Sequence, residues 1–225
     1  AVCAGYDVGP RVTEALGAMA LNNAGTSSHA MGAIFGSGAC ASVLANFDSA
    51  QVRRLISYLA HESSGLGCWM AEHDHVQKAY VFGAMGAKNA ITSALLVQSG
   101  WTGLEEALEG PRTLFQARAQ PAKGRSMEPP LVLGREILGS NIKKWCVGSP
   151  AQAPLDCMQA LLSTLPAMDQ IKSISVEIRS DEAFIVDNRD MPNICLQHLV
   201  ALYLVDRKLT FDSVHDYSRM DDPRV

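Results

Sequence analysis

The sequence predicts a mostly α-helical protein, in which a helical bundle is followed by a smaller α/β lid with a β-α-β-α order. Apolar residues recur at helical spacing in the first half, and two of its stretches are unusually rich in glycine and alanine. A polar, proline-containing stretch follows at 117–130. Beyond it, apolar residues alternate at 171–180, as they do in strands.

We expect every element of the first half to be helical. Gly9 and Pro10 are interpreted as a helix-breaking pair, after which a helix runs from about Arg11 to Leu21. The stretch at 30–45 is so rich in small residues that its helix propensity is poor, which makes sense where another helix backbone comes very close. The remaining helices are expected after the capping pair Asp48 and Gln51, at about 80–98, and in the short LEEALEG stretch at 104–110.

The second half is expected to alternate strands and helices. A strand with its approach is predicted at 137–147, a helix at 154–165, a strand at 171–180 and an apolar helix at 194–204. A parallel pair with a right-handed crossover is the default for that order. The predicted domains are therefore a helical domain at 1–118, a linker at 119–130 and an α/β lid domain at 131–225.

Composition narrows the classes of function. The formal net charge is −4 and no run of Lys or Arg occurs, which argues against a nucleic-acid surface. No apolar run reaches the ~20 residues that a membrane span needs. The six cysteines include no CxxC pair, and most of them stand among apolar or small neighbours, which favours a reducing, cytoplasmic compartment. We expect a small ligand, no nucleic acid and no membrane partner.

Lys78 and His29 are the first candidates for chemistry. Lys78 precedes an apolar helix, where a lysine either extends along its stem to solvent or is kept as a partner for an anion. His29 opens the small-residue helix, and a helix N-terminus attracts carboxylates and keeps an imidazole available as a base. From the residues alone, an extended surface lysine and a capping or loop histidine are the favoured interpretations.

The Glu72-His73-Asp74-His75 run contains residue types that bind zinc or iron. No cysteine or third histidine stands at ligand spacing, so a solvated loop is favoured, with His75 supporting Lys78 as the intermediate interpretation. No bound metal is therefore expected.

Further candidates lie in the second half. Lys143 and Lys144 would face opposite sides of a strand, so one could enter a cleft, and Ser149 belongs to a turn that could receive an anion. A surface strand is the plainer interpretation. His198 is the one polar ring in an apolar helix, where a core histidine with a hydrogen-bond partner is the usual finding.

Several motifs agree in order and spacing with a known family. They are HAMG at 29–32, LGCWM at 66–70, KAYVFGAMGA at 78–87, GWTG at 100–103 and LEGPR at 108–112. Together they resemble the MmgE/PrpD family, which includes 2-methylcitrate dehydratase, cis-aconitate decarboxylase and iminodisuccinate epimerase. Family chains are about twice as long, so we expect this chain to be an incomplete member.

The resemblance implies a homodimeric, cofactor-free enzyme whose active site lies between a helical domain and a lid. His29 matches the histidine of the family's H-x-x-G motif, Lys78 the lysine of K-x-x-x-x-G, and Lys143 the lysine that opens the lid segment. Lys144 is a one-place alternative to Lys143. His198 falls where cis-aconitate decarboxylase uses a tyrosine, and the proline that follows the lid lysine in the family is missing here.

These roles predict a lyase for a small di- or tricarboxylate. The first choice is a hydro-lyase that dehydrates a 2-methylcitrate-like hydroxy acid, as in propionate metabolism. His29 and His198 would move protons, while Lys78 and Lys143 would bind carboxylates, assisted by Lys144, His75 and Ser149. Decarboxylation and epimerisation are feasible with the same residues. A non-catalytic fragment or pseudoenzyme that keeps the fold is the alternative of another class.

Overall fold

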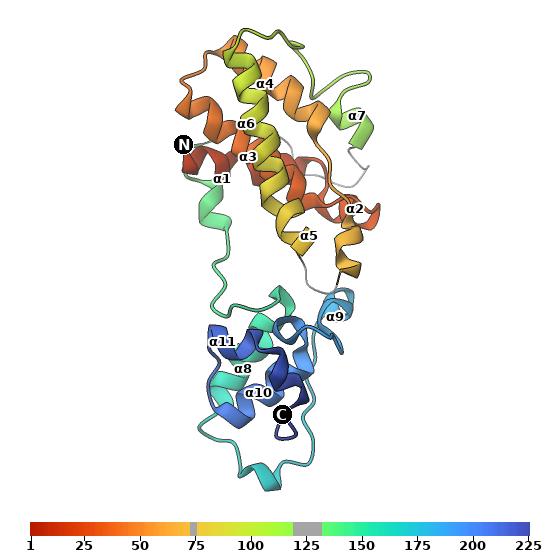
Figure 1. Ribbon diagram of the computed structural model, residues 1–225, viewed down its shortest axis with the longest axis vertical. Helices are drawn as coiled ribbons and strands as arrows, with labels where there is room; N and C mark the ends of the chain where they lie inside the picture. Colours follow the sequence, from red (N-terminus) through yellow and green to blue (C-terminus); the bar gives the residue numbers. More distant parts are fainter. Residues whose placement is uncertain (73–75, 119–131) are drawn as a thin grey trace. The chain divides into compact units, whose positions relative to one another are not determined.

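The computed structural model describes residues 1–72, 76–118 and 132–225 (Figure 1). It divides into two compact units, Ala1–Ser140 and Asn141–Val225. The predicted linker at 119–130 lies outside the described residues. No helix in the described ranges is long and apolar enough to cross a membrane.

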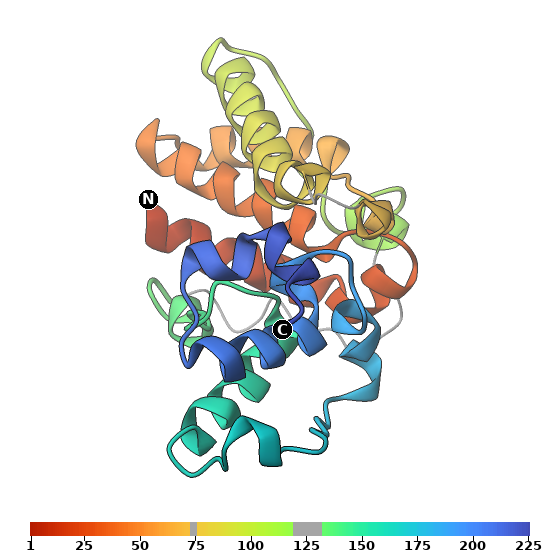
Figure 2. The same cartoon turned by 60° about the horizontal axis from the view of Figure 1, so that its bottom comes forward.

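The first unit is a bundle of helices around α3, as predicted. Helix α3 contacts α1 and α6, and α6 also contacts α4 (Figures 1 and 2). The elements of this unit are α1 (Val2–Ala15), α2 (Ala18–Asn23), α3 (Ser28–Leu44), α4 (Ser49–Glu62), the 3-10 helix η1 (Gly67–Ala71), α5 (Val76–Ala79), the π turn η2 (Tyr80–Ala84), α6 (Met85–Gln98), α7 (Leu114–Arg118) and the 3-10 helix η3 (Glu136–Gly139). Its buried core includes Leu16, Met31, Ile34, Leu55, Leu59 and Val97.

Glycines allow α3 to meet its neighbours backbone to backbone. A Cβ atom placed on Gly9 of α1 would lie 2.6 Å from the carbonyl oxygen of Gly32. A Cβ atom on Gly86 of α6 would lie 2.8 Å from the backbone nitrogen of Ile34. The expectation that the small residues at 30–45 admit another helix backbone is therefore confirmed on two sides of α3.

The predicted boundaries of the first helices were wrong. Gly9 and Pro10 lie inside α1 rather than before it, because Gly9 serves the close contact with α3 and not a turn. The break comes instead at Gly17, whose φ of +82° belongs to the left-handed region that favours glycine. Helix α4 begins as predicted, with a capping box between Asp48 and Gln51.

The prediction of a helix at 104–110 was also wrong, since the structure has no helix there. A carboxylate oxygen of Glu106 accepts hydrogen bonds from the backbone nitrogens of Leu108 and Glu109, at 3.1 and 3.2 Å. A short acidic side chain-to-backbone pattern of this kind competes with helical hydrogen bonding.

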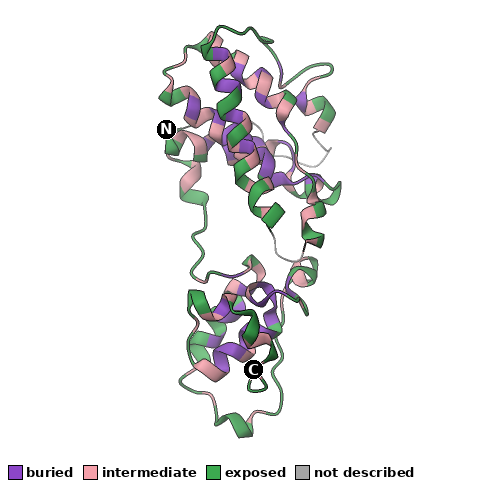
Figure 3. Cartoon of the chain, viewed as in Figure 1, coloured by how far each residue is buried: buried purple, intermediate pink, exposed green. Residues whose placement is uncertain are grey.

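The second unit is helical as well. Helix α10 packs on α8, and their apolar faces form a separate core that includes Leu155, Leu199, Leu202 and Tyr203. Figure 3 shows the buried residues gathered on the inner faces of the helices within each unit. The elements of this unit are η4 (Ser149–Ala151), α8 (Gln152–Leu161), η5 (Met168–Gln170), α9 (Ser180–Val186), η6 (Pro192–Ile194), α10 (Leu196–Asp206), α11 (Phe211–His215) and η7 (Tyr217–Asp221).

The β-α-β-α lid is not supported, because neither predicted strand forms. In the described residues, the isolated bridge between Thr26 and Leu66 is the one β pairing. Near 137–147, the backbone of Trp145 pairs with a side chain instead of a strand: Gln152 accepts from its nitrogen at 3.1 Å and donates to its oxygen at 2.8 Å. The segment at 171–179 has apolar alternation but neither helix nor strand.

Candidate active site

His29 and Lys78 meet around one aromatic ring in the first unit. The imidazole of His29 stacks on the ring of Phe82, with centroids 3.9 Å apart and planes 9° from parallel. The Nζ atom of Lys78 lies 5.5 Å from the Phe82 centroid and 5.6 Å from the centroid of Trp69. Trp69 in turn meets Phe82 edge to face at 4.8 Å. We call these four residues the aromatic cluster.

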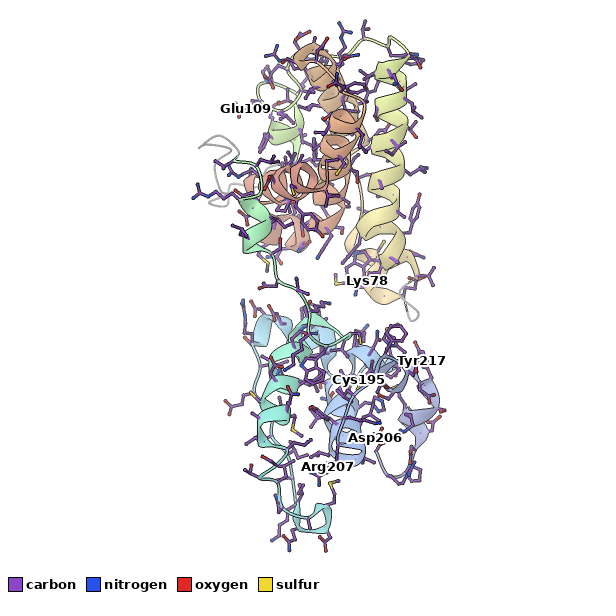
Figure 4. All side chains as sticks on the ribbon, turned by 90° about the vertical axis from the view of Figure 1, so that its left-hand side faces the viewer. Lys78, Glu109, Cys195, Asp206, Arg207 and Tyr217 are labelled. Carbon is purple, nitrogen blue, oxygen red and sulfur yellow. The ribbon has the colours of Figure 1, made fainter. Side chains whose placement is uncertain are left out.

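Three separate elements contribute to the aromatic cluster. His29 stands in the first turn of α3, Trp69 belongs to η1, and Lys78 and Phe82 come from the continuous helix formed by α5, the π turn and α6. Figure 4 shows Lys78 at the N-terminal end of that helix. Single π turns inside α-helices are frequent at functional sites.

The start of α3 is fixed by its neighbours. The backbone nitrogen of Ser28 donates to the side-chain oxygen of Asn22 at 3.0 Å, and that of Ser27 donates to the carbonyl oxygen of Gly65 at 3.0 Å. Ser27 and Ser28 are buried, whereas His29 is exposed. These contacts hold the helix N-terminus in place and direct the imidazole outward, onto Phe82.

The surroundings of Lys78 are more open than its sequence suggests. In the apolar π turn that follows Lys78, Tyr80 is 46% exposed, and Gly83 and Ala84 are exposed too. Lys78 itself is half-buried. Its ammonium thus lies near two aromatic rings, an arrangement that attracts a cation to the ring faces.

A groove of about 580 Å³ runs between α1 and α3 and reaches His29. Its lining includes Gly5, Tyr6, Glu14 and Gly36 but no lysine or arginine. The groove therefore offers no lysine or arginine to a carboxylate.

In the second unit, the two candidate lysines have different contacts. The Nζ of Lys143 donates to the carbonyl oxygen of Val147 at 3.2 Å, and the lysine is exposed. The Nζ of Lys144 donates to Asp156 at 2.8 Å, also contacts Gln159, and lies 5.0 Å from the Trp145 ring centroid. Hydrogen bonding from Lys144, and then from Trp145, lowers the pKa of Asp156.

Ser149 and His198 complete the candidates in this unit. Ser149 is exposed at the start of η4. His198 is 7% exposed within α10, and no described residue forms a hydrogen bond with its Nε2. Burial, and secondarily the positive charge of Arg219, lowers the pKa of His198 and favours the neutral ring. Neither lysine hydrogen-bonds His198 in the described part of the unit.

His75 lies outside the described residues, so its predicted role stays a prediction. The described ranges contain no group of three or more histidine, cysteine, aspartate or glutamate side chains that could hold a metal ion. Sequence reasoning missed Phe82 and gave Trp69 no role. The available signal was the spacing of Phe82, four residues after Lys78 and thus on the same helix face.

Comparison with known proteins identifies the family. The profile of the MmgE/PrpD N-terminal domain matches residues 1–125, which is more than half of the 225 residues. The match covers the described residues of the aromatic cluster. A search of curated proteins finds no match. The chain belongs to the MmgE/PrpD family.

Proposed function

We propose that this MmgE/PrpD family protein is a cofactor-free lyase for a small di- or tricarboxylate, and that it dehydrates a 2-methylcitrate-like hydroxy acid. The observation that carries the proposal is the aromatic cluster. It joins the family's motif histidine and motif lysine on the ring of Phe82, within the part of the chain that matches the family.

Dehydration of such an acid breaks a C–H bond next to a carboxylate and a C–O bond on the neighbouring carbon. A C=C bond forms and water leaves. In the proposal, His29 accepts the proton from carbon, and the leaving hydroxyl takes up a proton to depart as water. Stacking on Phe82 keeps the imidazole in one plane, so its ring nitrogens point in fixed directions during the transfer.

Lys78 is proposed to bind the carboxylate next to the breaking C–H bond. Negative charge moves onto this carboxylate as the proton leaves, so a nearby ammonium stabilises the transition state more than the ground state. The faces of Trp69 and Phe82 hold the ammonium and shield it from part of the surrounding water, which strengthens its attraction to the carboxylate.

The second unit contributes Lys143 and His198 in this proposal. Lys143 is exposed and free of acidic partners in the described residues, as a second carboxylate-binding lysine should be. His198 is favoured in its neutral form and would assist proton transfer. Lys144, Ser149 and His75 are proposed as further substrate contacts, although the partner of Lys144 in the structure is Asp156.

Proton NMR in heavy water tests the reaction class. The purified chain is incubated in turn with 2-methylcitrate, citrate and cis-aconitate. Loss of 2-methylcitrate with formation of an unsaturated acid supports the proposal. The methyl doublet becomes a singlet at lower field if the C–H bond beside the methyl group breaks, and a vinyl signal appears if a methylene C–H bond breaks. A product that has lost carbon dioxide identifies a decarboxylase, and solvent exchange alone identifies an epimerase. No change from a folded sample contradicts a catalytic role for this chain.

Lys78→Met then tests the site. The variant keeps the length and apolar stem of the side chain but removes the charge. We expect kcat/KM to fall at least ~100-fold, the scale of removing one electrostatic stabiliser of a transition state. Lys88→Met is the matched control, because Lys88 is an exposed lysine of α6 that is not one of the four residues of the aromatic cluster. Equal activity of the two variants would remove Lys78 from the mechanism.

A further inference from the structure

Two buried charged residues on α1 take no part in the proposed chemistry. Asp7 and Arg11 are one helical turn apart, and each is 2% exposed. The two carboxylate oxygens of Asp7 accept hydrogen bonds from the backbone nitrogens of Gly134 at 2.6 Å and Glu136 at 2.9 Å. Arg11 donates to the carboxylate of Glu136 at 2.5 Å. These contacts, which we call the α1 anchor, join residues more than 120 positions apart in the sequence.

The α1 anchor is polar rather than hydrophobic. Three apolar side chains of the attached segment, Val132, Leu133 and Leu138, are 54%, 75% and 85% exposed, and Ile137 is half-buried. The side chain of Glu136, in contrast, is 8% exposed. Most of the apolar side chains of the segment are therefore exposed, and the direction of the hydrogen bonds fixes where it lies on α1.

The α1 anchor holds the chain only a few residues before Lys143. Glu136 is five residues before Asn141, where the second unit begins, and seven residues before Lys143. Seven residues span at most about 25 Å when fully extended. A chain fixed at Glu136 therefore confines Lys143 far more than a chain that leaves the first unit earlier.

We propose that Asp7 and Arg11 are positioning residues, which fix the chain at Glu136 and thereby restrict the freedom of Lys143. This inference rests on the proposed function, in which Lys143 binds a substrate carboxylate. Confinement raises the effective concentration of the lysine at the substrate, and a loss of about 1 Å in placement can cost a catalytic site ~100-fold in rate. Neither residue touches the reacting atoms.

A double-mutant cycle tests the proposal in the full-length chain. Glu136→Ala removes the carboxylate to which Arg11 donates, and Arg135→Ala removes an exposed side chain of the same segment as the matched control. We expect Glu136→Ala to lower kcat/KM by 10- to 100-fold and Arg135→Ala to change it less than 2-fold. Because the α1 anchor acts through Lys143, adding Glu136→Ala to Lys143→Met should cause no further loss. Additive losses would overturn the proposal.

A second measurement tests the effect of the α1 anchor on chain mobility without requiring enzyme turnover. Backbone relaxation of the amides from Asn141 to Lys144 is compared by NMR in the wild type, Glu136→Ala and Arg135→Ala. We expect lower order parameters in Glu136→Ala alone, and Asp7→Asn should reproduce them if Glu136→Ala folds poorly. Unchanged order parameters would refute the positioning role. Inactive wild-type protein with the expected relaxation change would instead refute the proposed function and retain the α1 anchor.

Discussion

The contact between α1 and α3 predicts that Gly9→Ala destabilises the first unit. The new Cβ would lie 2.6 Å from the carbonyl oxygen of Gly32, whereas ordinary contacts begin at 3.4 Å. The two backbones must therefore separate by up to about 0.8 Å, and this overpacking costs about 1–3 kcal/mol. The gain in helix propensity from Gly to Ala, about 1 kcal/mol, offsets part of the cost. The expected net loss is about 0–2 kcal/mol.

Gly83→Ala isolates the steric contribution. Gly83 is also helical, but a Cβ there would meet no atom within 4 Å, so the variant gains helix propensity without a clash. The difference in unfolding free energy between the two variants should then equal the packing cost of about 1–3 kcal/mol. Urea unfolding followed by circular dichroism measures both midpoints, with the transition of the first unit fitted separately because the chain has two units. If both variants are equally stabilised, the close helix contact does not exist as described.

Two further predictions concern the aromatic and histidine contacts. Phe82→Leu should lower kcat/KM roughly 3- to 10-fold by removing the stack and the cation–π contact, whereas Phe211→Leu, which removes the matched stack on His215, should leave turnover unchanged. An equal effect of both variants would contradict a specific role for Phe82. Burial and Arg219 lower the pKa of His198, so the folded state disfavours protonation of its ring. The stability that the neutral ring contributes is therefore fully present above pH 6.5, the pKa in the unfolded chain. It is lost as the pH falls from 6.5 toward the pKa in the folded state. Unfolding midpoints at pH 7.5 and 5.5 should therefore differ less in His198→Leu than in the wild type, and an identical pH dependence would exclude this source.

Local signals in the sequence predicted the helical elements best. The start of α4 depends on a capping pair, Asp48 and Gln51. Because these two residues are only three positions apart, the local sequence alone reveals the pair. The small residues of α3 likewise indicated close helix contact. Their partners, Gly9 on α1 and Gly86 on α6, could not be assigned, because the identity of a packing partner depends on contacts between distant segments.

The predicted strands failed for the same reason. Alternation at Ile174 and Val176 describes which side chains share a face, but a strand also needs a neighbouring backbone to pair with. In the structure these two residues are 46% and 38% exposed, and the backbone of Trp145 pairs with Gln152. A glutamine seven residues away can replace a strand partner, and no periodicity in the sequence reveals that exchange.

The π turn at Tyr80–Ala84 determines the helix face on which Lys78 lies. Gly86 and Val97 are buried on α6, and Gly86 meets the backbone of α3 at Ile34. In a regular helix each residue turns about 100°, so Lys78, eight residues before Gly86, would lie about 80° from it on the side away from Val97. The π turn at Tyr80–Ala84 takes up one extra residue. Seven effective steps then place Lys78 within about 20° of Gly86, on the side of α3 where His29 begins the helix. The motif lysine and histidine could be found from the sequence, but a regular helix would have kept them apart.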